Sequence, residues 1–417
     1  MSYLYSKAVM SKEASFTMAL LDNKIKNDAL EAVASALLAN KDKIFEANKL
    51  DIDRSEKEGL ETPLLKRLKF DDHKLSDVVD GIRSLMTLED PVGKLKLHTT
   101  LDDGLELYRV TCPIGVIGVI FESRPDALVQ IATLCLKSGN SVFLKGGREA
   151  LETNKVLFET IRDASCSAGL PEGWINLLES RDDVNAMLEL NECIDLIIPR
   201  GSNSFVQYIM KNTTIPVMGH ADGVCHTYID KDADEDVAIK VATDAKTQYV
   251  SVCNATETIL VDRSLETTLL PKLIKALEDK NVIVHMEDDV SDWHHEYLDY
   301  EVSIKLTDSI DEAIDHINKY GSGHTDAIIT TNKENAEYFM NKVDSGSVLL
   351  NCSTRFADGF RYGFGAEVGI STSKLHARGP VGLEGLVSYK YKLYGSGNIV
   401  ADYASGDKKF KHIRRDI

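Results

Sequence analysis

The sequence predicts an α/β protein built on parallel sheets with helices on their faces. Short segments rich in β-branched residues, 108–121 and 141–147, alternate with helical segments at 127–137 and 149–168. The alternation resumes after residue 229, so we expect a second α/β domain with its own sheet. The length of 417 residues supports this division, because it exceeds one ordinary core and suits two or three domains.

The predicted elements begin with helices. Residues 11–55 are expected to be helical, because Leu30, Val33 and Leu37 recur on one face. The first domain should also contain strands at 174–179 and 193–199 and a helix at 184–190. After a helix that leads toward residue 253, the second domain should contain strands at 258–262, 282–286, 303–306, 327–331 and 347–351, and helices at 265–277 and 310–319.

The segment 385–400 alternates its side chains as a half-exposed strand does. We expect it to pair with residues near 105–110 in a protruding sheet. Such a sheet would suit a contact between subunits.

The composition is that of a globular protein, with 43% hydrophobic and 27% charged residues. A formal charge of −18 disfavours general binding to nucleic acid or anionic membranes, so an anionic ligand needs a local basic or dipolar pocket. Seven scattered cysteines without CxxC spacing and the lack of a long apolar stretch favour a cytoplasmic protein. No histidine has zinc-ligand spacing, so we expect no metal site.

Cys253, in the stretch VSVCNATE, is either a nucleophile or a buried structural thiol. A nucleophilic cysteine reacts as the thiolate, which needs hydrogen-bond donors or positive charge nearby. Asn254 and the residues after it could form a turn whose N–H groups face the sulfur. The residues alone favour burial, because most cysteines belong to the core.

Two segments that follow strands could hold a phosphate. Arg200, Gly201 and Ser202 come after an apolar strand and open a helix, although an ordinary tight turn is the favoured interpretation. Lys145 and Arg148 could bind a phosphate or a ribose, or could be exposed loop cations.

Other loops suit an anionic substrate that accepts hydrogen bonds. Arg124 could grip a carboxylate or a phosphate with two hydrogen bonds, or could pair with Glu122. The loops 351–356 and 365–372 combine hydroxyl groups, small residues and Arg355.

Long segments of the chain occur in the order found in a known family. They are PIGVIGVIFESRPDA, CLKSGNSVFLKGGREALETN, IDLIIPRGSNSFV, VCNATETILV, YGSGHTDAIITT, NCSTRFADG, GAEVGISTSKLHARGPVGLEGL and YKYKLYG. From about residue 10 to about 400 the chain resembles the gamma-glutamyl phosphate reductases, or glutamate-5-semialdehyde dehydrogenases, of the aldehyde dehydrogenase superfamily. The resemblance implies an NADP-linked enzyme of proline biosynthesis that reduces L-glutamyl 5-phosphate to L-glutamate 5-semialdehyde and phosphate.

The resemblance also implies the fold. We expect an aldehyde dehydrogenase-like α/β fold with a Rossmann-type cofactor domain, an α/β catalytic domain and a small β flap, assembled as a homodimer or homotetramer. The expected boundaries are 1–104 and 118–228 with part of 361–384 for the cofactor domain, 229–360 for the catalytic domain, and 105–117 and 385–417 for the flap and tail.

The resemblance assigns roles to individual residues. Cys253 is the implied nucleophile, with Asn254 and Ser123 near the developing oxyanion. The implied cofactor-binding residues are Lys145, Arg148, Arg200, Gly201, Ser202 and Glu296, and the implied substrate-binding residues are Arg124, Ser353, Thr354 and Arg355.

Hydrolytic aldehyde dehydrogenases carry a water-activating glutamate in the segment that matches 216–226, and this chain has none there. The absence suits an enzyme that must protect a thioester from water. The same segment contains His220, whose contribution is open. The substrate would come from a separate glutamate kinase, with which a transient contact is expected. The alternatives are an aldehyde dehydrogenase that acylates CoA and a non-catalytic binding protein that keeps the fold.

Overall fold

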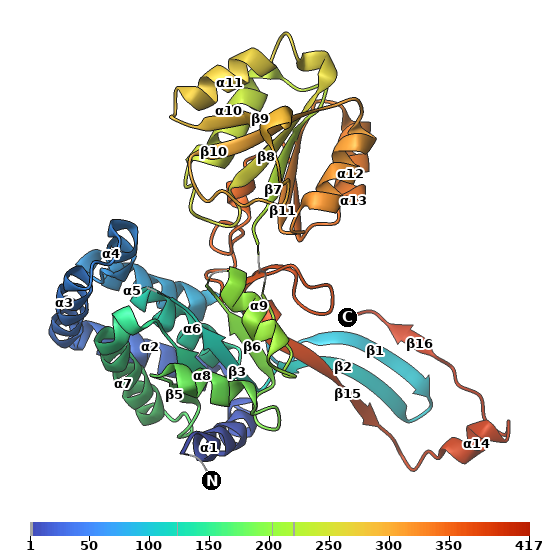
Figure 1. Cartoon of the computed structure of the whole chain (residues 1–417). Helices are drawn as coiled ribbons and strands as arrows, with labels where there is room; N and C mark the ends of the chain where they lie inside the picture. Colours follow the sequence, from blue (N-terminus) through green and yellow to red (C-terminus); the bar gives the residue numbers. More distant parts are fainter. Residues whose placement is uncertain (1–2, 123, 202, 220–221) are drawn as a thin grey trace.

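The computed structural model of the chain describes residues 3–122, 124–201, 203–219 and 222–417. Two α/β bodies and a long antiparallel sheet that projects from them make up the molecule (Figure 1). No helix in the described part of the chain is both long and apolar enough to cross a membrane.

The first body contains a parallel sheet in the order β5–β4–β3–β6. Its strands are β3 (Val116–Ile120), β4 (Ser141–Lys145), β5 (Ile175–Leu177) and β6 (Leu196–Pro199). Side chains alternate between two cores, so that Ile117 and Val119 enter one core while Val116 and Ile120 enter the other. Helices therefore cover both faces, as a buried parallel sheet requires.

The helices of the first body divide between these two faces. The core that holds Ile117 is covered by α2 (Asn23–Ala39), α5 (Asp72–Thr87), α6 (Pro125–Lys137) and α7 (Leu151–Ser167). The opposite core is covered by α1 (Tyr3–Met18), α8 (Arg181–Leu188) and α9 (Asn203–Lys211). The two remaining helices of the N-terminal region are α3 (Lys41–Lys57) and α4 (Thr62–Leu68).

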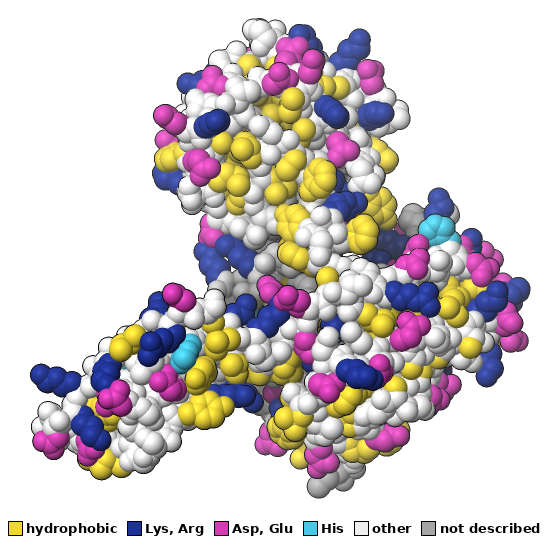
Figure 2. All heavy atoms as spheres, turned by 180° about the vertical axis from the view of Figure 1, so that it is seen from behind, with side chains coloured by type: hydrophobic (Ala, Val, Ile, Leu, Met, Phe, Trp, Pro, Cys, Tyr) yellow, Lys and Arg dark blue, Asp and Glu magenta, His cyan; other side chains and the backbone are white. Residues whose placement is uncertain are grey.

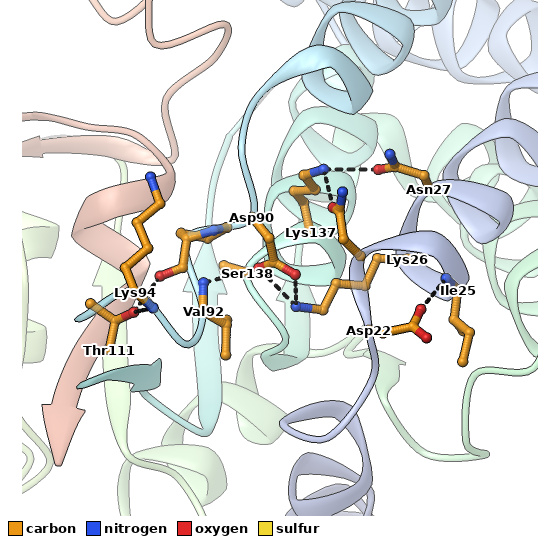
Figure 3. Close-up of polar contacts among 12 residues, drawn as sticks. Asp22, Ile25, Lys26, Asn27, Asp90, Val92, Lys94, Thr111, Lys137 and Ser138 are labelled. Carbon is orange, nitrogen blue, oxygen red and sulfur yellow. Dashed lines mark hydrogen bonds and ion pairs between the residues drawn. The ribbon is translucent and has the colours of Figure 1, made fainter. Parts of the chain in front are cut away.

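Two buried lysines attach α2 to the rest of this body (Figure 3). Lys26 Nζ lies 2.9 Å from the Asp90 carboxylate, and Lys137 Nζ on α6 donates to Asn27 Oδ1 at 2.8 Å. Burial lowers the pKa of Lys137. Because each ammonium group has oxygen partners, the lysines can lie inside the helical layer.

The second body contains a six-stranded parallel sheet in the order β12–β11–β7–β8–β10–β9. Its strands are β7 (Cys225–Ile229), β8 (Thr256–Asp262), β9 (Ile283–Met286), β10 (Glu301–Thr307), β11 (Thr325–Ile329) and β12 (Ser347–Leu350). One face packs on α10 (Glu235–Thr247) and α11 (Leu270–Glu278), and the other on α12 (Ile310–Tyr320) and α13 (Lys333–Lys342).

The projecting sheet is antiparallel, in the order β15–β2–β1–β16. It is formed by β1 (Leu95–Asp102), β2 (Leu105–Pro113), β15 (Val387–Tyr394) and β16 (Ile413–Arg415), and the short helix α14 (Val400–Ala404) precedes β16. The expected pairing of the C-terminal strand with residues near 105–110 is confirmed, because Lys390 faces Val110 and Tyr394 faces Glu106. We call this sheet the flap.

The sheets differ from the expected domain boundaries in three places. The expected boundary after residue 117 would cut β3, which pairs with β4 and β6 and so belongs to the first parallel sheet. Residues 95–102 form β1 and pair with β2, so the flap begins before residue 105. A boundary at 228 would cut β7, which pairs with both β8 and β11 and so belongs to the six-stranded sheet. Within 361–384, the strands β13 (Gly369–Ser371) and β14 (Gly379–Val381) form a small antiparallel pair.

Candidate active site

A pocket of about 340 Å³ is lined by residues from both bodies. Seen from behind, the molecule narrows and is hollowed between the two bodies, and Lys and Arg side chains lie around this waist (Figure 2). The pocket brings together Cys253, Asn254, Arg124, Arg200, Gly201, Glu296 and Arg355 from among the residues expected from the sequence. It is also lined by Asp358, Glu367 and Gly369, among others.

Cys253 lies half-buried in the loop between α10 and β8. The segment 223–225 packs directly against its backbone. A Cβ atom placed on Gly223 would lie 2.3 Å from the Cys253 carbonyl oxygen and 2.4 Å from its Cα, so only glycine fits there. Cys225 Sγ, at the start of β7, donates to the same carbonyl oxygen at 3.1 Å. The position of the thiol is therefore set by the sheet behind it.

Asn254 faces the pocket but is engaged by the chain itself. Its Nδ2 donates to Ala357 O at 2.9 Å, while its Oδ1 is buried without a hydrogen-bond partner among the described residues. The amide therefore holds the loop after Cys253 against the turn that contains Ala357. Ser123, the other residue expected near the oxyanion, lies outside the described residues, as do Ser202 and His220.

The expected substrate-binding residues Ser353, Thr354 and Arg355 occupy different positions. Thr354 is fully buried, and its Oγ1 lies 3.2 Å from Thr256 Oγ1 on β8. Ser353 begins the short 3₁₀ turn Thr354–Phe356 and accepts a hydrogen bond from the Arg355 backbone N–H. Arg355 lines the pocket, and its Nε donates to Gln248 Oε1 at 3.0 Å. Ser353 and Thr354 thus support the turn that presents Arg355.

Three arginines line this pocket. Burial lowers the pKa of Arg200 and of Arg355, and both guanidinium groups interact electrostatically with Cys253. Burial also opposes the charge on Arg124, but its ion pair with Asp126 at 2.7 Å leaves its pKa raised overall. The pocket therefore places three guanidinium groups near the thiol, together with the carboxylates of Glu296, Asp358 and Glu367.

The loop that carries Glu296 is attached to a buried ion pair between α10 and β8. Lys246 Nζ lies 2.7 Å from Glu257 Oε2, and both side chains are fully buried. The same oxygen accepts the Tyr297 backbone N–H at 3.3 Å. Burial raises the pKa of Glu257 to about 7, an effect that Lys246 opposes. The pair thus connects the loop that carries Glu296 to β8, directly after the Cys253 loop.

The cofactor-binding candidates follow the carboxyl ends of the first parallel sheet, where nucleotides bind in this class of fold. Lys145 ends β4 almost fully buried, with its Nζ donating to Gly146 O. Arg148 is largely exposed and forms an ion pair with Glu58 at 3.6 Å. Arg200 and Gly201 follow β6 and come directly before the described start of α9. This set of donors and cations fits the phosphate and ribose groups of a dinucleotide.

Comparison with known proteins identifies the family. The model of the aldehyde dehydrogenase family matches residues 6–292 and 302–386. A gamma-glutamyl phosphate reductase of Ruminiclostridium cellulolyticum is 63% identical over 96% of this chain and 95% of its own length. One of Acetivibrio thermocellus is 62% identical over 97% of this chain and 96% of its own. The chain belongs to the gamma-glutamyl phosphate reductases of the aldehyde dehydrogenase family.

Solved structures agree with this family. The crystal structure of the gamma-glutamyl phosphate reductase of Thermotoga maritima is 37% identical and aligns with a TM-score of 0.92 over 95% of this chain and all of that chain. An acetylating aldehyde dehydrogenase of Geobacillus thermoglucosidasius, at 15% identity, aligns with a TM-score of 0.69 over 95% of this chain and 97% of its own, which shows the shared fold alone. The expected aldehyde dehydrogenase-like fold is confirmed. NAD(P) is the cofactor of this family.

Three residues at this reductase site were not predicted from the sequence: Gly223, Glu257 and Glu367. Gly223 lies in the 216–226 segment, but its contact with Cys253 depends on the pairing of β7 with β8. Glu367 lies in the loop GAEVGIST. A single acidic residue among small and hydroxyl residues is a pattern from which a ligand-binding role could have been predicted.

Proposed function

We propose that the chain reduces L-glutamyl 5-phosphate to L-glutamate 5-semialdehyde and phosphate with NADPH, as the second step of proline biosynthesis. The observation that carries this proposal is the half-buried Cys253 in a pocket lined by three arginines. The thiol suits attack on an acyl group, and the arginines suit an anionic substrate. The names of the relatives supply the particular acyl phosphate.

The reaction starts at the thiolate of Cys253, the reactive form of a cysteine, in the pocket that Arg200 and Arg355 also line. The thiolate attacks the acyl carbon, the carbon–oxygen bond to phosphate breaks, and phosphate leaves with the bonding electrons. The guanidinium group of Arg355 would stabilise this leaving group. When bound, NADPH supplies the hydride that reduces the resulting thioester. Collapse of the thiohemiacetal then releases the aldehyde and restores the thiolate.

In this proposal the cofactor lies along the carboxyl edge of the first sheet. Lys145 and Arg148 would hold the adenosine ribose and its 2′-phosphate, and Arg200 with Gly201 would lie near the pyrophosphate. Glu296 would hold the nicotinamide ribose. The exposed Arg148 guanidinium supports a preference for NADPH, because its ion pair with Glu58 is a weak surface contact that a phosphate can replace.

The thioester must be protected from water. The segment that carries the water-activating glutamate in hydrolytic relatives has Asp222 as its acidic residue here, and Asp222 accepts a hydrogen bond from Asn203 at the start of α9. A carboxylate held in this way is a poor general base. We therefore propose that phosphate, rather than water, takes up the acyl group in the reverse direction.

We further propose a cytoplasmic homo-oligomer that receives its substrate from a separate glutamate kinase. A thiolate nucleophile and seven free cysteines favour a reducing compartment. The kinase contact would be transient, because the acyl phosphate is labile. Kinetics of the coupled kinase and reductase test it, since the absence of any protection of the intermediate would contradict the contact.

The reverse reaction tests the proposed function. Glutamate 5-semialdehyde and NADP should give NADPH at a steady rate with phosphate and not with CoA in its place. A steady rate without either acceptor would instead identify a hydrolytic dehydrogenase. A CoA-dependent rate would identify an acylating aldehyde dehydrogenase, and no rate with folded protein would favour a binding protein.

A further inference from the structure

Glu367 is a carboxylate in the pocket that is also lined by Arg124, Arg200 and Arg355. It lies just before β13 and lines the pocket that holds Cys253. Its Oε2 accepts the Gly359 backbone N–H at 2.8 Å, which fixes the side chain in place. Among the described residues, none forms an ion pair with it. Burial raises the pKa of Glu367. Arg200 and Arg124, which do not form ion pairs with it, oppose this shift.

The neighbouring acid Asp358 differs from Glu367, because its carboxylate is already satisfied. Asp358 Oδ1 accepts the backbone N–H groups of Phe360 and Arg361 at 3.0 and 3.1 Å. The Arg361 guanidinium also lies 3.4 Å from Asp358 Oδ2. Asp358 therefore orders its own turn, whereas Glu367 accepts its hydrogen bond from the described residues through Oε2 alone.

An acid at this position would repel the phosphate and carboxylate groups of the proposed substrate. Such a charge in a partly buried pocket is costly unless a cation compensates it. The nearby cations compensate it only in part, because Arg124 pairs with Asp126 at 2.7 Å, and Arg200 interacts electrostatically with Glu367 and with the thiol but forms no ion pair with Glu367 among the described residues. The missing cation can therefore come from the ligand.

We propose that the Glu367 carboxylate binds the α-ammonium group of the glutamyl substrate. The inference rests on the proposed function, since this substrate carries an ammonium group at the end away from the acyl phosphate. Arg124, which lines the same pocket and interacts electrostatically with Glu367, would receive the α-carboxylate. Glu367 would then make the enzyme specific for an α-amino acid chain.

The variant Glu367→Gln tests this inference, because the amide oxygen can still accept the Gly359 N–H while the charge is lost. Wild type and variant are compared on glutamate 5-semialdehyde and on 5-oxopentanoate, which keeps the carboxylate and lacks only the amino group. We expect KM for the amino acid substrate to rise roughly tenfold to a hundredfold, as for loss of a hydrogen bond between charged groups, with a small change in kcat. The values for 5-oxopentanoate should stay the same or improve.

Inhibition provides a second readout that needs no turnover of an analogue. L-Glutamate and glutarate differ by the ammonium group alone, so the variant should lose affinity for L-glutamate and keep or gain affinity for glutarate. Asp358→Asn is the matched control and should affect both ligands alike. Equal losses in Glu367→Gln for both ligands, or no change, would overturn the inference. If wild type lacks phosphate-dependent activity, the proposed function itself fails.

Discussion

At the scale of single residues, the position of the Cys253 thiol depends on a residue without a side chain. Gly223 lies against the backbone of Cys253, and the Cys225 thiol donates to the Cys253 carbonyl oxygen. The reactive group is thus fixed through its main chain, which leaves its side chain free to face the arginines. A nucleophile held in this way is preorganised for attack.

We predict that Gly223→Ala lowers kcat/KM by about a hundredfold or more, because the added methyl group must displace Cys253 and a shift of about 1 Å in a reacting group has this effect. Steady-state kinetics on protein whose folding is checked by circular dichroism measure the change. Gly81→Ala is the control, since no atom lies within 4 Å of a Cβ there. Full activity of Gly223→Ala would contradict the assigned contact.

At the scale of elements, the second body buries a histidine that has no hydrogen-bond partner for its Nε2 among the described residues. His316 on α12 is 4% exposed and packs against the rings of His226 and Trp293. Burial lowers its pKa to about 3, and the neighbouring side chains of His226, Lys305, Lys319 and His294 act in the same direction. The folded chain therefore keeps this ring neutral.

This burial predicts a pH dependence of stability. An unfolded histidine titrates near pH 6.5, so between about pH 3 and 6.5 the unfolded chain binds more protons and stability falls as the pH falls. Between pH 7 and pH 5 this burial should lower the free energy of unfolding by about 2 kcal/mol. His316→Phe should remove this part of the pH dependence. Urea unfolding at both pH values measures it. If the free energy of unfolding falls by the same amount in wild type and variant, His316 is not the cause of the pH dependence.

Much of the element order could be predicted from the sequence, because buried parallel strands are short apolar runs separated by amphipathic helices. The strand β1 was missed, although Asp103 and Gly104 form a turn signal and Gly104 adopts φ +68°. The Cys253 segment could be located from its motif. The contacts of Gly223, Glu257 and Glu367 could not, because each depends on segments that only the folded chain brings together.

At the scale of the whole molecule, the flap leaves an edge strand with apolar side chains in solvent. Tyr389, Tyr391 and Leu393 lie on one face of β15 and are exposed. Exposed apolar edge strands usually mark an interface, because they can pair with another chain. The flap is therefore the surface through which we expect the subunits to associate.

We predict that Leu393→Asp converts the wild-type oligomer to a smaller species, because a buried carboxylate would be left unpaired in the interface. Size-exclusion chromatography with light scattering measures the mass. Lys392→Asp, on the opposite face of the same strand, is the control and should change the mass less. A monomeric wild type, or an oligomer unchanged by Leu393→Asp, would contradict this role of the flap.

The central claim is that the Cys253 thiolate carries the acyl group between phosphate and the hydride donor. Rapid mixing with glutamate 5-semialdehyde and NADP in the absence of phosphate tests it most directly. The account predicts a burst of about one NADPH per active site and an acyl group on Cys253, with steady turnover once phosphate is added and no burst in Cys253→Ser. A burst that persists in Cys253→Ser, or an acyl group on another residue, would contradict it.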